Sequence, residues 1–242
     1  MQCLVDREPL PPFILEYLED EELAQRDFEA PFVSLLIRSC QLLSAHKAAG
    51  SMDDALAAHA TRLLEDWSLW PSEPLEWPPT TPVRDMKNSD EIHHMVWLAV
   101  AHLTQQGVMI VISDLSLEYA HAQYTSTPSP STSKSLERAV KDQFSLCNTL
   151  RASITYHMED FAMCKAAAKT MGAQALLWPL STLLGLKTTM REDCEWCVGQ
   201  AVKIAEMFNL KHAKMMADMM AMAAMASPRR STSLWFFGTG DL

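Results

Sequence analysis

The chain has 242 residues, of which 48% are hydrophobic and 21% charged, with a formal net charge of −10. This composition is typical of a globular protein and excludes a disordered one. The acidic balance argues against direct binding of nucleic acid, because binders usually present a basic surface to phosphates. Only 7 residues are glycine, so the turns of a many-stranded β protein are scarce, and we expect an all-α fold.

The first thirty residues combine prolines with an acidic run. Pro9, Pro11 and Pro12 predict an extended entry, and a short amphipathic segment follows at 13–18. The stretch from Asp6 to Glu29 is either a solvated surface or an acidic contact surface for a partner. No signal peptide is expected, so we interpret the six cysteines as reduced thiols of an intracellular protein.

Two amphipathic helices are predicted next. Apolar residues recur at three- and four-residue spacing from about 31 to 48, and Gly50 ends this helix. Ser51 is predicted to cap a second helix that ends before Pro71. The proline-rich stretch from Trp70 to Thr81 is predicted to cross the surface without helix.

The longest helix is expected from Asn88 to about Gln123. Polar residues interrupt its apolar stretch between Met95 and Leu115, which favours a buried core helix over a membrane span. The segment 124–135 is rich in serine, threonine and proline and is predicted to be a flexible loop. Its Thr127-Pro128 and Ser129-Pro130 pairs either stay unmodified or accept phosphate from a proline-directed kinase.

Helical patterns resume after this loop. Helices are predicted from Leu136 to about Met158 and from Asp160 to Leu184, the latter interrupted at Pro179. A capping box at Thr189 begins the next helix, which ends near Asn209, and a last helix covers 211–226. The pattern thus predicts seven or eight helices in one irregular domain, 1–226, followed by a tail, 227–242.

No standard catalytic, cofactor-binding or metal-binding motif is found. Cys194 and Cys197 have the spacing of a redox or zinc pair, but the expected fold lacks strands and further ligands, which favours structural thiols. His94 and His102 share a helix face, where packed or solvent-tipped histidines are more common than ligands. We therefore expect no cofactor and no metal, and the sequence favours a protein without enzymatic activity.

The last helix and the tail offer possible contact surfaces. The methionine-rich stretch from Met215 to Met222 is interpreted as core or subunit interface, with a ligand or partner groove as the alternative. The tail begins with Arg229-Arg230 and continues with the apolar run Leu234–Phe237. It either docks back on the domain or presents a short recognition segment.

Several segments form an ordered pattern. Gln2–Pro12 runs from a Leu-Val-Asp-Arg core into prolines, and Tyr156–Phe161 lies in an aromatic-rich helix. Ala175–Leu180 contains Trp178-Pro179, and a helix pair from Arg191 through Asp218 has a joint at Asn209. This pattern resembles the fungal-specific transcription factor domain, the carboxy-terminal regulatory domain of fungal Zn(II)2Cys6 zinc-cluster transcription factors. The zinc cluster is absent, because the six cysteines are spread over nearly the whole sequence.

The resemblance implies a transcription regulator of the nucleus or cytoplasm, acting on a gene set such as a fungal metabolic cluster. Its expected partner is a protein, either a DNA-binding transcription factor or a second copy in a homodimer, with neither nucleic acid nor membrane bound directly. The alternatives are a helical enzyme that binds a hydrophobic small molecule and steers its cyclisation or rearrangement, and a truncated product without activity. A ligand pocket would be lined by Trp97, Tyr156, His157 and Trp178, the last interpreted as filling the kink at Pro179.

Overall fold

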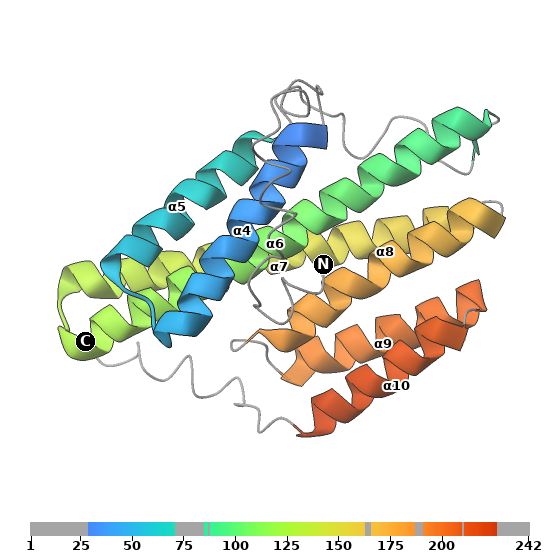
Figure 1. Ribbon diagram of the computed structural model, residues 1–242. Coiled ribbons are helices and arrows are strands. Elements are labelled where there is room, and N and C mark those ends of the chain that lie inside the picture. The colour runs from blue at the N-terminus through green and yellow to red at the C-terminus, as the bar shows by residue number, and fades with distance from the viewer. Residues whose placement is uncertain are drawn as a thin grey trace. The chain divides into compact units, whose positions relative to one another are not determined.

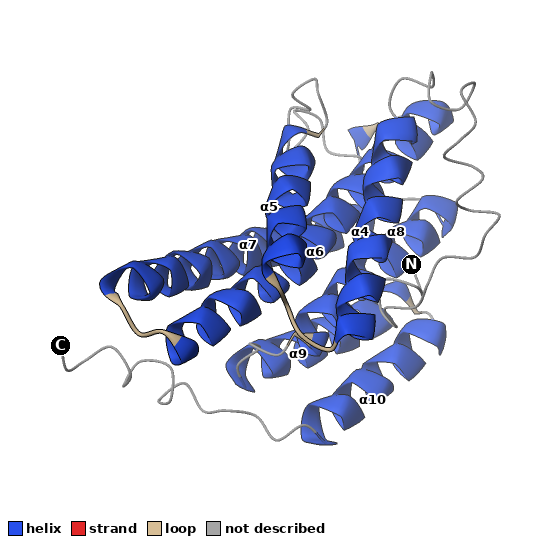
Figure 2. Cartoon of the chain, turned by 60° about the vertical axis from the view of Figure 1, so that its left-hand side comes forward, coloured by secondary structure: helices blue, strands red, loops and turns tan. Residues whose placement is uncertain are grey.

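Seven α-helices make up the part of the chain that the structure describes, and that part contains no strand (Figures 1 and 2). This computed structural model describes residues 29–70, 85–86, 88–162, 166–186, 191–209 and 211–226. The prediction of an all-α fold is confirmed. The helices are α4 (Glu29–Ala49), α5 (Asp54–Leu69), α6 (Ser89–Ser126), α7 (Pro130–Ala162), α8 (Ala166–Gly185), α9 (Arg191–Phe208) and α10 (Lys211–Ala226).

Some predicted features fall outside the described residues. They are the acidic stretch before Glu29, the proline-rich crossing at 71–81, Cys3 and Cys164, the capping box at Thr189, and the tail 227–242. The first of the family-like segments, Gln2–Pro12, is also among them.

Two helix ends follow the predicted chemistry and one does not. Gly50 and Asn209 have φ angles of 74° and 51°, so both adopt the left-handed conformation expected where a helix closes. The predicted cap of α5, Ser51, is wrong: Asp53 is the cap, and its carboxylate accepts a hydrogen bond of 2.8 Å from the Leu56 amide. A side chain two positions closer to the first turn reaches an amide that Ser51 does not.

The segment 124–135 is mostly helical, contrary to the predicted loop boundaries. Helix α6 continues to Ser126 and α7 begins at Pro130. The Ser129 hydroxyl accepts from the Thr132 amide at 3.2 Å, and the Thr132 hydroxyl accepts from the Ser129 amide at 3.0 Å. This reciprocal cap, with proline in the first helical position, starts a helix within a polar sequence that predicts none.

Helix α8 passes through Pro179 without ending, so the predicted interruption is wrong, as is the predicted boundary between 158 and 160. Leu176, Leu180 and Leu183 lie on one face of α8 and are at most 4% exposed. Burial of each such side chain contributes about 1.5–3 kcal/mol. Together they outweigh the cost of an interior proline, which is about 3 kcal/mol.

The chain divides into two compact units. Unit 1 comprises Met1–Thr80 and Val108–Leu146, and unit 2 comprises Thr81–Gly107 and Cys147–Leu242. Helices α6 and α7 therefore each contribute one part to unit 1 and the other to unit 2. The single domain expected over 1–226 stays a prediction.

The core of unit 1 is built where α4 packs on α5. Trp67 is fully buried, and its indole N–H donates to the Ser39 hydroxyl at 3.0 Å. The Arg38 guanidinium donates to the Asp66 carboxylate at 2.6 Å, one residue away on both helices. The α4–α5 contact thus combines an apolar interior with cross-helix polar bonds.

Helix α6 is the one helix of the described part that is long and apolar enough to cross a membrane by length and composition. Of its most apolar window, 67% is buried within the protein. Burial of this kind is typical of the central helix of a globular protein, which passes the same length and composition test. The burial agrees with the expected core helix.

Candidate functional site

The interior of unit 2 places two histidines on neighbouring helices. On α6, Gln106 follows His102 by one helical turn, and the Gln106 amide nitrogen lies 3.2 Å from Nε2 of His102. An amide NH₂ group only donates, so the ring nitrogen accepts. His157, on α7, is 1% exposed and close enough to His102 for their charges to interact.

Aromatic rings surround His157. Its imidazole stacks on Phe161 with ring centroids 5.0 Å apart and an angle of 17° between planes. Tyr156 meets it edge-on at 5.2 Å. Phe161 in turn contacts Gly172 of α8, where an added Cβ would lie 2.4 Å from the phenyl ring. The glycine thus permits close approach of α8 to the aromatic rings of α7.

Both histidines are uncharged near neutral pH. Burial lowers the pKa of His102 from 6.5 to about 4. Burial, and secondarily the charge of His102, lowers the pKa of His157 to about 3. Desolvation penalises the charged imidazole, and two neighbouring cations would repel each other, so both effects act in the same direction. Neutral imidazoles can bind a polar ligand group but carry no cationic charge to bind an anion.

Trp178 of α8 lies against the backbone of α6. A Cβ added at Gly107 would lie 2.4 Å from Cζ3 and 2.8 Å from Cη2 of the Trp178 ring. The indole nitrogen is buried, and no hydrogen-bond acceptor reaches it among the described residues. The same holds for the side-chain oxygen of Gln106. Unit 2 therefore holds a buried donor and a buried acceptor that the described residues leave unsatisfied.

The four predicted pocket residues all belong to unit 2. Tyr156 and His157 are in ring contact, Trp178 lies against Gly107, and Trp97 is half-buried on α6. The pocket itself stays a prediction. Sequence reasoning missed Gly107 and Gly172, although a single glycine inside an apolar helix is a signal for close packing.

Cys194 and Cys197 are buried free thiols on α9. Burial raises the pKa of Cys197 to about 12, more than the nearby Arg151 lowers it. Arg151 pairs with Asp193 at 3.0 Å and lies 4.7 Å from the centre of the Trp196 ring. A thiol that stays protonated is a poor nucleophile toward disulfides. The interpretation of these cysteines as structural thiols stays a prediction.

The described residues contain no group of three or more His, Cys, Asp or Glu side chains placed to hold a metal ion. The polar groups inside unit 2 include the imidazoles of His102 and His157, the amide of Gln106, the indole of Trp178 and the side chain of Asp160, which is 2% exposed. The imidazoles, the amide and the indole can each form a hydrogen bond with an uncharged molecule.

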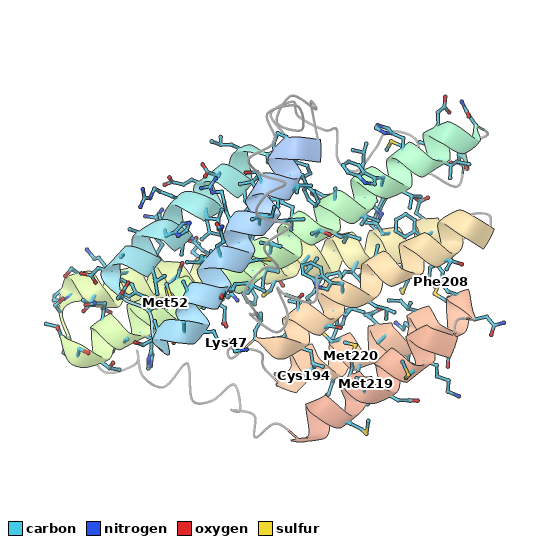
Figure 3. The ribbon with its side chains drawn as sticks, viewed as in Figure 1. Lys47, Met52, Cys194, Phe208, Met219 and Met220 are labelled. Carbon is cyan, nitrogen blue, oxygen red and sulfur yellow. The ribbon has the colours of Figure 1, made fainter. Side chains whose placement is uncertain are left out.

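The second feature of unit 2 is an exposed surface on α10, which packs on α8 and α9 (Figures 1 and 2). Ala217 and Met220 are buried, whereas Met215, Met219 and Met222 are 51%, 52% and 64% exposed. Figure 3 labels Met219 and Met220 on this helix. Spacings of four and three residues place the exposed three on one side of the helix, and we call them the methionine face. The methionine-rich stretch is thus partly core and partly solvent-facing.

No protein-family model, no curated protein and no solved structure matches this chain. Function must therefore be inferred from the chain's own residues and from the family-like segments of its sequence.

Proposed function

We propose that this chain is a regulator-like helical protein that acts through protein contacts. The process it serves is transcription of a gene set, such as a fungal metabolic cluster. The protein itself would be located in the nucleus or cytoplasm. The observation that supports this proposal is the methionine face of α10. Flexible, polarisable methionine side chains adapt to the apolar side of a partner, and exposed apolar patches are common at protein contacts.

The partner would be a protein such as a DNA-binding transcription factor. The net charge of −10 disfavours DNA contact by this chain alone. A gel-shift assay at low salt with the purified protein should show no sequence-specific complex. A tight, sequence-specific complex would contradict this part of the proposal.

The proposal is tested by replacing the native gene with an allele that carries Met219→Gln and Met222→Gln. Glutamine has similar length and helix propensity, so α10 is preserved while the apolar face is lost. Transcripts of the regulated set should fall as they do on gene deletion, at unchanged protein level. Lys203→Gln, at an exposed polar position of α9, is the matched control and should leave transcripts unchanged.

Metabolite profiles of the deletion strain distinguish the rival functions. Unchanged transcripts with one accumulated intermediate would overturn the regulator and support an enzyme. No change in transcripts or metabolites would overturn both and support a product without activity.

A second candidate function is binding of an uncharged, largely hydrophobic small molecule, including its use as an enzyme substrate, inside unit 2. The buried Trp178 indole N–H, which no described residue accepts from, favours it. A hydrophobic ligand with one carbonyl or ether oxygen would satisfy this donor. Titration of such compounds should shift the unfolding temperature of the native chain, and Trp178→Phe should reduce the shift. Equal shifts in both proteins would contradict the assignment.

A further inference from the structure

The methionine face concentrates exposed apolar surface on one short helix. Met215, Met219 and Met222 are three of the eight large hydrophobic side chains that the described residues expose, yet α10 has only 16 residues. The same helix buries Ala217 and Met220, so its packing in unit 2 is already satisfied on the other side. The face is therefore free to receive an additional segment.

The size of the face favours a short occupant over a second copy of the chain. Three half-exposed methionine side chains present roughly 300 Å², the scale of an ordinary surface patch. A stable dimer buries about 800 Å² on each partner. A single extended or helical segment with a few apolar side chains fits the smaller area.

We propose that the segment 227–242 of the same chain docks on the methionine face and competes there with the protein partner. The competition, unlike the docking itself, rests on the proposed function. The segment follows directly after Ala226, the last residue of α10. It contains Leu234, Trp235, Phe236 and Phe237 in succession. Sulfur–aromatic contacts between methionine and such rings are favourable by about 0.3–1.5 kcal/mol each.

The chain is long enough for this contact. Met215 precedes Ala226 by eleven residues, which corresponds to about 16 Å along the helix. Leu234 follows Ala226 by eight residues, which span at most about 29 Å when extended. Pro228 is unsuited to a helix interior. The apolar run can therefore reach the whole face from the end of the helix that carries it.

Charge and chain connectivity both favour docking of the segment 227–242 on the methionine face. Asp218 is exposed on α10 between Met215 and Met222, and Arg229-Arg230 lie between Ala226 and the apolar run. Lys214 is exposed at the end of the face that is farther from Ala226 along α10. A short tether raises the effective concentration of the segment to the millimolar range, so weak contacts suffice for docking.

Methionine oxidation by hydrogen peroxide, followed by peptide mass spectrometry on the full chain, tests the docking. The three methionines of the face should oxidise slowly in the native chain. Replacing Trp235, Phe236 and Phe237 by serine should raise their rates about tenfold, as loss of about 1.4 kcal/mol of docking would give. Met220 should stay slow in both proteins, and Ser231→Ala with Ser233→Ala should match the native chain.

Equal rates in the native chain and the triple serine variant would overturn the proposal, because the face would then be open in both. Protection that grows with protein concentration would also overturn it and identify a second copy as the occupant. The transcript assay separates this inference from the proposed function. Docking without any effect of Met219→Gln and Met222→Gln on transcripts would sustain the tail contact and overturn only the regulator.

Discussion

Trp67 in unit 1 and Trp178 in unit 2 differ in the partner of the indole nitrogen. Trp67 donates to the Ser39 hydroxyl, which itself donates to the Leu35 carbonyl at 2.7 Å, so this part of the core is closed in hydrogen bonds. Trp178 buries its N–H without an acceptor among the described residues. A satisfied polar group in a core specifies packing, whereas an unsatisfied one costs about 1–3 kcal/mol. The two tryptophans thus differ in the cost of burying the indole nitrogen, and the surroundings of Trp178 are the place to search for a ligand.

The largest effect is expected from removal of the satisfied tryptophan. Trp67→Ala deletes a fully buried side chain and its rings' contacts with Phe32 and Trp70, at centroid distances of 5.8 and 6.0 Å. The free energy of unfolding should fall by about 3–5 kcal/mol. Urea denaturation measures this loss. A loss below about 1 kcal/mol would show that the α4–α5 core is not the stable part of unit 1.

The next largest effect is expected on acidification, which should lower the stability of unit 2 more than that of unit 1. The pKa values of His102 and His157 fall from 6.5 in the unfolded chain to about 4 and about 3 in the folded one. Below pH 6.5 the unfolded chain binds protons that the folded one does not, so stability is full above this pH and is lost as pH falls toward 4. Between pH 6.5 and 5.5 the two histidines together should cost about 2 kcal/mol.

Hydrogen exchange locates this loss. Amides of α8 in unit 2 should lose protection on acidification before those of α4 in unit 1. His102→Gln retains a polar side chain but no imidazole, and should roughly halve the fall in stability between pH 6.5 and 5.5. The same pH dependence in native and variant proteins would contradict the assignment to these two histidines.

A glycine contact sharpens the comparison further. Gly107→Ala would place a methyl group against the Trp178 ring, whereas an alanine at Gly199 of α9 would meet no atom within 4 Å. Overpacking at Gly107, less the gain in helix propensity, should cost about 1–2 kcal/mol. Gly199→Ala should instead stabilise by about 0.5–1 kcal/mol. Thermal unfolding of the two variants should therefore shift in opposite directions.

The sequence predicts the helices of this fold better than the contacts between them. Periodicity locates every described helix, because the apolar face of each must be buried wherever it packs. Capping depends on one side chain reaching one amide, so Asp53 and the Ser129–Thr132 pair were not anticipated although their residue types suit the role. The predicted helix interruption at Pro179 is wrong for a similar reason. The local cost of the proline is outweighed by the burial of leucines, which depends on tertiary packing.

The candidate site is less predictable for a related reason. The sequence predicts Tyr156, His157 and Trp178 as lining residues of a ligand pocket. Their neighbours Gly107 and Gly172 matter only because side chains of other helices pack directly against them, and the sequence does not show which helices do so. The neutral state of His157 likewise depends on burial and on His102, which lies on another helix.

The smallest expected effect is that of Trp178→Phe, and its comparison with Trp67→Phe is the most direct test of the difference between the tryptophans. Trp67→Phe breaks the bond to Ser39 and leaves a small cavity, so it should cost about 1–2 kcal/mol. Trp178→Phe also loses ring volume, but it removes a buried donor that no described residue satisfies, and these two effects should nearly cancel. Paired urea denaturation curves measure both. If Trp178→Phe costs as much as Trp67→Phe, then the Trp178 indole has an acceptor outside the described residues. In that case the unsatisfied indole N–H would no longer support a ligand site in unit 2.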